Sequence, residues 1–464
     1  MKYVDLFSGC GGLSLGMENA GFELTVAVEK SDMAARTFFH NLISDASSEP
    51  DWLRYCNESL EAQLQAGVIV DQLSTLLADD KAMNFLKSES VDVVVGGPPC
   101  QGFSLAGKRN PDDVRNKLPW EFLSFVEKTN PRAVVIENVV GMKQKFSPDT
   151  ESSFEQLQVA LAETAVGYVV QGVEVNAMHF GAPQHRPRLM IIGLRKDVAD
   201  KLGVTSSGSL WKSNFLDLLD EEIPDLAPVP TLNSKDVVTV AAAIADLSST
   251  APRNSKDSNS KYLRALNSKA WGVKPKGKQS IANNVLRRHN ERTVLRFMVY
   301  QLFSDHGIDS RLLSRVSHLG SEEARREMEL AFALLSFPAK TSSNHVLAQT
   351  EDELIDLCFD LLTKKHSQKV LKWDSPSRTV VTIPDDYVHP AEPRLFTVRE
   401  LARFQGFPDD FEFLGKETTG AHRRKVEVPQ YSQVGNAVSP WLAVAVGRKL
   451  RSVFGGLNEG TDRS

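Results

Sequence analysis

The sequence predicts a doubly wound α/β fold that is completed by a second, more irregular domain. Between Met1 and Arg195, short apolar runs typical of buried strands alternate with helical patterns. Several of these runs end at a glycine or proline turn or at an acidic residue. Parallel strands joined by helices produce this alternation. Such a sheet binds its ligands at the carboxyl ends of its strands, so the residues after each run are the candidate site residues.

Length and composition narrow the classes of protein. The chain has 464 residues and a net charge of −5, so we expect two domains, with any surface for a polyanion confined to one face. Cys10, Cys56, Cys100 and Cys358 are far apart, which argues against a zinc site or a disulfide framework and fits a reducing cytoplasm. We expect neither a membrane span nor a signal peptide.

The first strand, expected over Tyr3–Phe7, leads into a glycine-rich turn and a short helix. A second strand, Leu24–Val28, ends in Glu29. A strand, a glycine turn, a helix, a strand and an acid form the arrangement of nucleotide-binding folds. There the glycines expose backbone N–H groups to the ligand, and the acid accepts hydrogen bonds from ribose hydroxyls. A purely structural glycine turn is the alternative.

The fourth expected strand delivers a cysteine to the sheet edge. A third strand, Val68–Val70, comes before it and is followed by a helix expected over Leu73–Lys87. The fourth strand then breaks at Gly-Gly-Pro-Pro and is followed by Cys100. The glycines let a substrate approach the backbone, and the prolines fix the turn. A thiol placed there suits nucleophilic chemistry if its pKa is lowered or a base is near, and a buried inert cysteine is the alternative.

Two further segments add charged candidates to the same edge. The strand Ala133–Ile136 is followed by Glu137, a candidate proton donor or relay, with an exposed loop carboxylate as the alternative. Arg186 and Arg188 are two positions apart on an extended segment between two later strands. Their side chains would point the same way, as a clamp for a phosphate or a base oxygen requires. An exposed basic edge strand is the alternative.

From about residue 197 to residue 390 the alternation of strands and helices disappears, although Glu322–Phe337 and Glu351–Leu362 have the pattern of amphipathic helices with ordinary packing roles. Basic residues gather between Lys261 and Arg296, with Tyr262, Trp271 and His289 among them. A polyanion such as nucleic acid would bind to a basic patch of this kind, although an ordinary solvent-exposed face can have the same composition.

Regular patterns return toward the C-terminus. We expect a strand over Val380–Ile383 and a helix over Thr397–Gln405, whose first residue forms a capping box with Glu400. The segment Tyr431–Val438 then opens a last apolar helix, and Gly455–Ser464 is expected to be a disordered tail.

Six of these segments, in this order, resemble the motifs of the DNA cytosine-5 methyltransferase family. DLFSGCGGLSLG resembles the loop for S-adenosylmethionine, GGPPCQGFSLAGKR the nucleophile motif, ENV the acid motif and QHRPR the arginine pair. RLFTVRELARFQGFPDDFEF and QVGNAVSP resemble the last two motifs. The likeness covers Met1–Arg195 and Trp373–Leu450, and the uncovered middle falls where the family keeps its target-recognition region.

The resemblance implies a Rossmann-like S-adenosylmethionine methyltransferase domain and a smaller, irregular target-recognition domain. We place the catalytic domain at residues 1–196, completed by 431–454, and the target-recognition domain at 197–430. Residues 455–464 are then the tail. S-adenosylmethionine is the expected cofactor, no metal is expected, and double-stranded DNA is the expected partner of a monomer.

The resemblance also assigns roles to residues. It implies that Cys100 adds to C6 of a cytosine flipped out of the duplex, and that Glu137 holds N3 and the exocyclic amine. Arg188 would contact the base oxygen and Arg186 a nearby phosphate. The implied cofactor contacts are Phe7, Gly9, Gly11, Glu29, Asp71, Gln72, Pro99, Leu118, Asn436 and Val438. The expected DNA contacts are Gln101, Ser104, Lys108, Arg109 and Arg115 in a closing loop, and Lys274, Lys276, Lys278, Arg287 and Arg288 in the basic stretch.

Several alternatives stay open at the level of sequence. The same chemistry on tRNA occurs in one branch of the family, but the long middle region favours DNA. A DNA-binding relative without catalysis is the third hypothesis, and the presence of Cys100, Glu137 and both arginines argues against it. The resemblance further implies a bacterial, cytoplasmic protein, associated with the nucleoid when it binds DNA. Its role would lie in restriction–modification, with a separately encoded endonuclease, or in phage defence.

Overall fold

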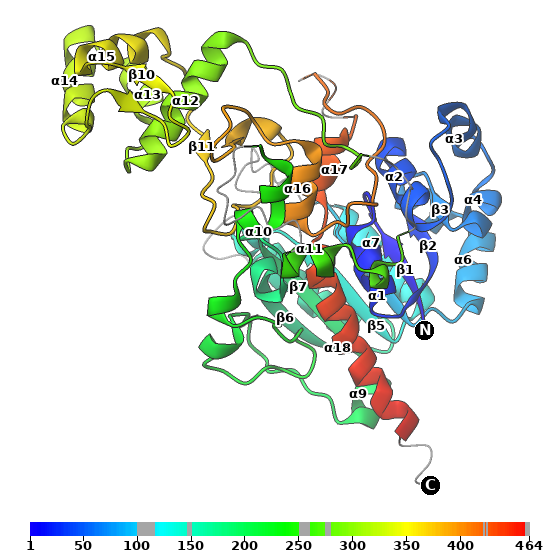
Figure 1. Cartoon of the computed structure of the whole chain (residues 1–464). Helices are drawn as coiled ribbons and strands as arrows, with labels where there is room; N and C mark the ends of the chain where they lie inside the picture. The colour runs from blue at the N-terminus through cyan, green and yellow to red at the C-terminus, as the bar shows by residue number, and fades with distance from the viewer. Residues whose placement is uncertain are drawn as a thin grey trace.

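The structure is a computed structural model, and its helices and strands are shown in Figure 1. It describes residues 1–99, 117–145, 151–249, 260–273, 280–420, 423 and 426–459. Among these residues, no helix combines the length and the apolar character needed to cross a membrane.

In the described part of the chain, eight strands form one central sheet in the order β3-β2-β1-β4-β5-β7-β6-β8. Their bounds are β1 (Lys2–Leu6), β2 (Glu23–Val28), β3 (Val68–Ile69), β4 (Val93–Gly96), β5 (Ala133–Asn138), β6 (Tyr168–Asn176), β7 (Pro187–Arg195) and β8 (Trp211–Lys212). The first five strands pair in parallel, whereas β7 is antiparallel to both β5 and β6.

The predicted doubly wound α/β sheet is confirmed, but the expectation that it would be parallel throughout is wrong at β7. Residues 177–186, all described, connect β6 to β7 and contain a 3-10 helix (Ala177–Phe180) in place of a crossover helix. A parallel connection needs a dozen or more residues and a crossover, so this short connection forces β7 to return antiparallel.

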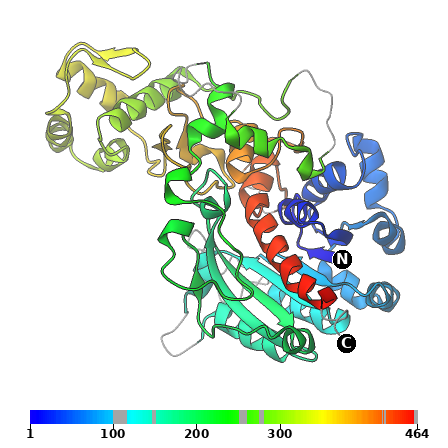
Figure 2. The ribbon, with the colours of Figure 1, turned by 60° about the horizontal axis from the view of Figure 1, so that its bottom comes forward.

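Helices cover both faces of the sheet, as Figure 2 shows with α18 crossing one face. On β4, Val94 packs in one apolar cluster, whereas Val93 and Val95 pack in another, because successive side chains point to opposite faces. The first cluster is covered by α5 (Leu73–Ala78), α6 (Asp80–Ser88), α7 (Leu118–Thr129) and α8 (Ser153–Glu163). The second is covered by α1 (Gly12–Asn19), α9 (Lys196–Leu202) and α18 (Pro440–Glu459).

Three helices lie beside the edge strand β3: α2 (Asp32–Leu42), α3 (Glu49–Cys56) and α4 (Leu60–Ala66). The single helix expected over Leu73–Lys87 is wrong, since it divides into α5 and α6 at Asp79. The Asp79 side chain accepts a hydrogen bond of 2.9 Å from the N–H of Ala82 and so starts a new helix.

The middle of the chain contributes to two different cores. Helices α10 (Val240–Ile244), α11 (Lys261–Leu266), α16 (Val398–Gln405) and α17 (Gln430–Asn436) share an apolar cluster with Cys10 and Leu15, at the N-terminal end of the chain. The helices expected over Glu322–Phe337 and Glu351–Leu362 are confirmed as α14 (Ser321–Phe332) and α15 (Glu351–Asp360). The segment before them, expected to be irregular, instead contains α12 (Glu291–Asp305) and α13 (Leu312–Arg315). These four helices build a separate core and, with β9 (Ala339–Lys340) and β10 (Val346–Ala348), form what we call the helical lobe (Figure 1).

Three local expectations can be compared with the structure. The capping box between Thr397 and Glu400 is confirmed at the start of α16. The expected strand Val380–Ile383 is wrong, because the backbone carbonyl and N–H of Val380 form hydrogen bonds with the side chains of Arg186 and Gln184. The parallel pair nearby is β11 (Lys369–Val370) with β12 (Tyr387–Val388). The tail expected from residue 455 is wrong for its first residues, since α18 continues to Glu459 and buries Phe454.

Candidate active site

One edge of the sheet collects the predicted site residues. The carboxyl ends of β1 to β5 lie there, and the antiparallel direction of β7 brings its amino end to the same edge. The glycine loop therefore follows β1, Glu29 follows β2, and Asp71 follows β3. Asn138, at the end of β5, pairs in register with Leu189 on β7, so Glu137 and Arg188 meet at this edge.

The loop after β1 presents its backbone to open space. Phe7, Gly9 and Gly11 have φ angles of 59°, 55° and 97°, in the left-handed region that glycine tolerates best. A Cβ added at Gly9 would meet nothing within 4 Å. The Glu29 carboxylate accepts hydrogen bonds from the N–H groups of Gly9, at 2.9 Å, and Ser31, at 2.7 Å, so it holds this loop to the end of β2.

Burial shifts the pKa values of two acidic residues beneath the loop. Desolvation raises the pKa of Asp5 to about 7, although Asp5 accepts a 2.6 Å hydrogen bond from the Ser14 hydroxyl. Burial also raises the pKa of Glu29, opposed by the N–H groups that it accepts. The loop is therefore built on carboxylates that the surrounding protein desolvates.

The last motif returns to this loop, as predicted. A Cβ at Gly12 would collide with the carbonyl oxygen of Val438, so the segment between α17 and α18 lies directly against the start of α1. Val438 itself is buried, whereas Asn436 is exposed. The remaining expected cofactor contacts are partly or fully exposed beside the strand ends: Asp71, Gln72, Pro99 and Leu118.

The turn that leads to Cys100 is fastened to β5. A Cβ at Gly97 would lie 3.0 Å from Glu137 Oε2, and Asn138 donates a 3.0 Å hydrogen bond from Nδ2 to the carbonyl of Pro98. Asn138 is not among the residues predicted from the sequence, where its one signal is its place beside Glu137 at a strand end. Residues of this motif that lie outside the described part of the chain are Cys100, Gln101, Ser104, Lys108, Arg109 and Arg115.

Glu137 and Arg188 form a buried ion pair. Glu137 Oε1 lies 2.8 Å from Arg188 Nε, and the two side chains are 10% and 11% exposed. Burial lowers the pKa of the Arg188 guanidinium, and the neighbouring Glu137 carboxylate opposes that shift. A carboxylate and a guanidinium side by side offer an acceptor and several donors, which suits the polar edge of a heterocyclic base.

Arg186 does not join this pair. It is 1% exposed and donates its terminal N–H groups to the backbone carbonyls of Val380, Gly435 and Ala437. Arg186 therefore does not present its guanidinium to a phosphate, which corrects that expectation. The reason is local: Arg188 lies in β7, whereas Arg186 precedes it and turns into the interior.

The basic stretch is divided between surface and core. Arg288 is exposed, and Arg287 lies 3.4 Å from Asp385, whereas Lys274, Lys276 and Lys278 lie outside the described residues. Tyr262 and Trp271 are buried, with ring centroids 5.8 Å and 5.4 Å from that of Trp441. Those two aromatic rings are core residues, so the expectation that they belong to a nucleic-acid surface is wrong.

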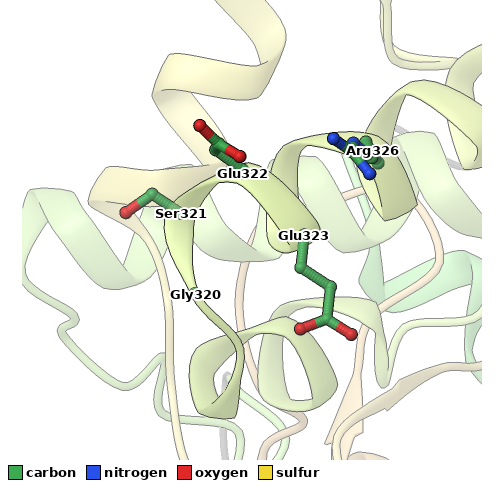
Figure 3. A pocket seen from close by; sticks show the side chains of 5 residues that line it. All are labelled: Gly320, Ser321, Glu322, Glu323 and Arg326. Atoms are coloured by element: carbon green, nitrogen blue, oxygen red, sulfur yellow. The ribbon is translucent and has the colours of Figure 1, made fainter.

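A shallow surface hollow on the helical lobe is unrelated to this edge. Gly320, Ser321, Glu322, Glu323 and Arg326 line it, all at the start of α14 (Figure 3). None of the predicted site residues contributes to it.

Comparisons with known proteins agree with the geometry. Type II methyltransferase M.DdeI of Desulfomicrobium norvegicum is 29% identical over 99% of this chain and 90% of its own length. Type II methyltransferase M.AgeI of Thalassovita gelatinovora is also 29% identical, over 97% of this chain and 99% of its own.

A solved structure supports the fold. It is that of a protein encoded within an E. coli prophage and described as a DNA modification methyltransferase. The two chains align with a TM-score of 0.51 at 22% identity, over 98% of this chain and 99% of the other. The family described as C-5 cytosine-specific DNA methylase matches residues 1–452, and this chain therefore belongs to that family.

Proposed function

We propose that this protein methylates C5 of a flipped-out cytosine within a specific sequence of double-stranded DNA, through a covalent bond between Cys100 and C6. One observation carries the proposal. Glu137, buried in its ion pair with Arg188, lies beside Gly97, and its neighbour Asn138 donates a hydrogen bond to the carbonyl of Pro98. The turn over Gly97 and Pro98 leads along the chain to Cys100. The pair shares its edge of the sheet with the loop over Gly9.

The chemistry needs both a nucleophile and a proton donor. Addition of the Cys100 thiolate to C6 turns the ring into an enamine, whose C5 is nucleophilic. Glu137 holds N3 and the exocyclic amine and supplies a proton as charge develops there. Arg188 keeps Glu137 in place and contacts the base oxygen. Once C5 carries the methyl group, loss of the C5 proton to a base and release of the Cys100 thiolate restore the aromatic ring.

The edge fits S-adenosylmethionine, which supplies the methyl group when it is bound. The open space over Gly9 leaves room for the ligand against the backbone, and the Glu29 carboxylate, fixed by two N–H groups, retains lone pairs for ribose hydroxyls. Asp71, Gln72, Pro99 and Leu118 complete the proposed site with Asn436 and Val438.

Duplex DNA would bind across the sheet edge and the target-recognition domain. We keep residues 1–196 and 431–454 as the catalytic domain and 197–430 as the target-recognition domain. Within the latter, α10 and α11 share an apolar cluster with Cys10 and Leu15 of the catalytic domain. The proposed closing loop carries Ser104, Lys108, Arg109 and Arg115, which lie outside the described residues. Of the proposed basic surface, the structure describes Arg288, which is exposed, and Arg287, which lies 3.4 Å from Asp385.

A covalent trap tests the mechanism. The protein is incubated with S-adenosylmethionine and duplex DNA that carries 5-fluorocytosine in the target sequence, because fluorine at C5 prevents release of the enzyme. We expect a denaturation-resistant adduct that Cys100→Ala abolishes. An adduct that survives Cys100→Ala, or methyl incorporation into tRNA in preference to duplex DNA, would contradict the proposal.

The relatives named above support a biological setting. Both are type II methyltransferases, so we propose that this protein protects host DNA within a restriction–modification system whose endonuclease is encoded separately. Bisulfite sequencing of DNA from a host that expresses the protein should reveal one methylated sequence context. Methylation spread over unrelated contexts would contradict a sequence-specific role.

A further inference from the structure

Three buried polar side chains converge on the turn between α17 and α18. Arg186 precedes β7, Gln184 lies two positions earlier, and Gln405 ends α16. Gln184 and Gln405 are fully buried, and Arg186 is 1% exposed. We call these three residues the carbonyl clamp, because most of their hydrogen bonds go to backbone carbonyl groups.

Arg186 supplies the charged part of the clamp. Its Nη2 donates to the carbonyls of Gly435, at 2.7 Å, and Ala437, at 2.9 Å. Its Nη1 donates to the carbonyl of Val380 at 3.0 Å. Two carbonyls that flank Asn436 thus share one guanidinium group, and hydrogen bonds from a charged donor are stronger than neutral ones.

The two glutamines hold the same turn from a second direction. Gln405 Nε2 donates to the carbonyls of Val434, at 2.7 Å, and Ala437, at 3.0 Å. Gln184 donates to Gln405 Oε1 at 2.7 Å and accepts the N–H of Val380, also at 2.7 Å. The clamp is therefore one connected network, and such networks fix geometry more firmly than isolated pairs.

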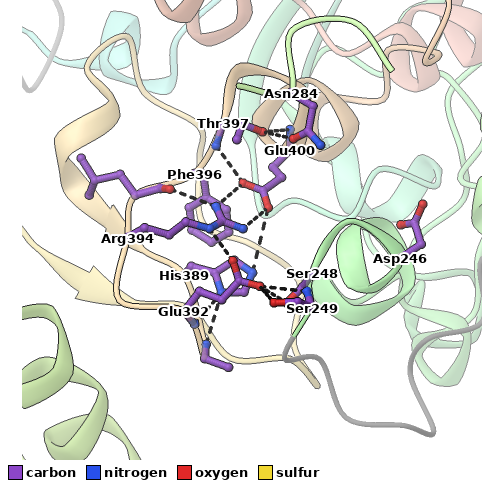
Figure 4. A network of polar contacts seen from close by, with 12 residues as sticks. Asp246, Ser248, Ser249, Asn284, His389, Glu392, Arg394, Phe396, Thr397 and Glu400 are labelled. Carbon is purple, nitrogen blue, oxygen red and sulfur yellow. Dashed lines mark hydrogen bonds and ion pairs between the residues drawn. The ribbon is translucent and has the colours of Figure 1, made fainter. Parts of the chain in front are cut away.

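Helix α16, which carries Gln405, is anchored at its other end. Figure 4 shows Glu400 between Arg394 and Thr397, close to the start of the helix. Arg394 donates to both carboxylate oxygens of Glu400, at 2.9 Å and 2.8 Å, and the N–H of Thr397 donates to Oε2 at 2.7 Å. Gln405 therefore projects from a helix that has little freedom to shift.

The clamped turn faces the proposed cofactor loop. It carries the exposed Asn436, and the carbonyl of Val438 lies against Gly12. The Arg186 end of the clamp is two positions from Arg188, which pairs with Glu137. The clamp thus joins the base-holding side of the edge to its cofactor side, through residues that would touch neither ligand.

We propose that the carbonyl clamp is a positioning device for S-adenosylmethionine, in which Arg186 and Gln405 hold Asn436 and Val438 at the distance from the glycine loop that the cofactor requires. This inference rests on the proposed function. It assigns Arg186 to the cofactor side, in place of the phosphate contact expected from the sequence.

The test compares Arg186→Lys with a matched variant, Arg399→Lys. Arg399 is also fully buried and also donates to backbone carbonyls, but to those of Ala282, Pro408 and Phe411, which lie outside the clamped turn. Lysine keeps the charge and loses the planar fork in both variants. S-adenosylmethionine binding is measured by calorimetry and duplex binding by fluorescence anisotropy, well below the melting temperature of each variant.

We expect Arg186→Lys to raise the Kd for S-adenosylmethionine about tenfold and to leave the Kd for duplex DNA within about twofold. Gln405→Met should shift cofactor affinity in the same direction by a smaller factor. Arg399→Lys should lower the melting temperature without changing cofactor affinity.

Equal cofactor affinities in Arg186→Lys and Arg399→Lys would overturn the clamp, and so would a rise confined to the Kd for DNA, which a phosphate contact predicts. These outcomes are distinct from a failure of the proposed function. In that case the wild-type protein itself would bind no S-adenosylmethionine, or would form no adduct with the fluorinated duplex.

Discussion

The sheet edge and the helical lobe differ in the kind of side chain that they bury. The edge buries ionisable groups: Asp5 is completely buried, and the side chains of Glu137 and Arg188 are only 10% and 11% exposed. The core of the lobe is apolar, with Phe303, Met328 and Leu354 each completely buried. Its ion pairs stay at the surface, as between Arg325 and Asp352, whose side chains are 39% and 82% exposed.

This difference shows where the fold accepts a cost in stability. Burying a charge is unfavourable even when it is paired, and well-packed apolar residues would often stabilise the same space better. Natural proteins break local rules of this kind mainly at functional sites. We therefore expect substitutions at the edge to change chemistry and pH dependence, and substitutions in the lobe to change stability according to burial alone.

The largest effect should follow Glu137→Gln at the edge. The amide keeps the shape of the carboxyl group but cannot supply a proton, so single-turnover methylation should fall by about 10³-fold while cofactor binding stays unchanged. Glu89→Gln is the control, because Glu89 pairs with Lys2 at the opposite edge of the sheet. A fall of less than tenfold in Glu137→Gln would show that the carboxyl group is not the proton source.

In the lobe, Phe303→Ala should lower the free energy of unfolding by about 3 kcal/mol, since it leaves a cavity in a close-packed core. Urea unfolding measures the change. Leu334→Ala is the matched control, because the Leu334 side chain is 97% exposed in the same lobe and its loss should cost almost nothing. Equal effects of the two variants would remove the contrast between core and surface.

Asp5→Asn should make stability less sensitive to pH. The pKa of Asp5 is about 7 in the folded protein against an ordinary value of 3.8, so between these values the folded state holds more protons than the unfolded state. The contribution of Asp5 to the free energy of unfolding therefore falls as the pH rises toward 7, and the variant lacks this decrease. Relative to the wild type, Asp5→Asn should gain on the order of 2 kcal/mol between pH 5 and pH 8. A constant difference in urea unfolding over this range would contradict the expectation.

The smallest effect should follow Arg325→Ala on the lobe surface. Arg325 contacts Asp352 and Asp356 at 2.8 Å and 3.3 Å, but both partners are largely exposed to water. Solvent-exposed ion pairs contribute little, so the free energy of unfolding should change by less than about 0.5 kcal/mol. A loss above about 2 kcal/mol would mean that the lobe, too, depends on its charges.

Much of the edge could be predicted because its signals are local. The glycines follow β1, Glu29 follows β2, and Glu137 lies at the end of β5, so each is next to its own strand in the sequence. The carboxyl ends of parallel strands meet at one edge of the sheet. The helical lobe was less predictable, because its amphipathic helices carry no motif and were recognised only over α14 and α15. The buried Tyr262 and Trp271 were misassigned because a basic neighbourhood says nothing about which way a ring points.

The sequence by itself determined the class of fold, the order of the motifs and the strand ends at which they lie, since alternation, capping and glycine turns act over a few residues. Only the tertiary structure decided that β7 runs antiparallel, that Glu137 pairs with Arg188, and that Arg186 turns inward. The physical reason is the separation along the sequence between the residues that interact. Arg186 and Gly435 are 249 positions apart, and which carbonyls a buried guanidinium finds depends on the packing of every element between them.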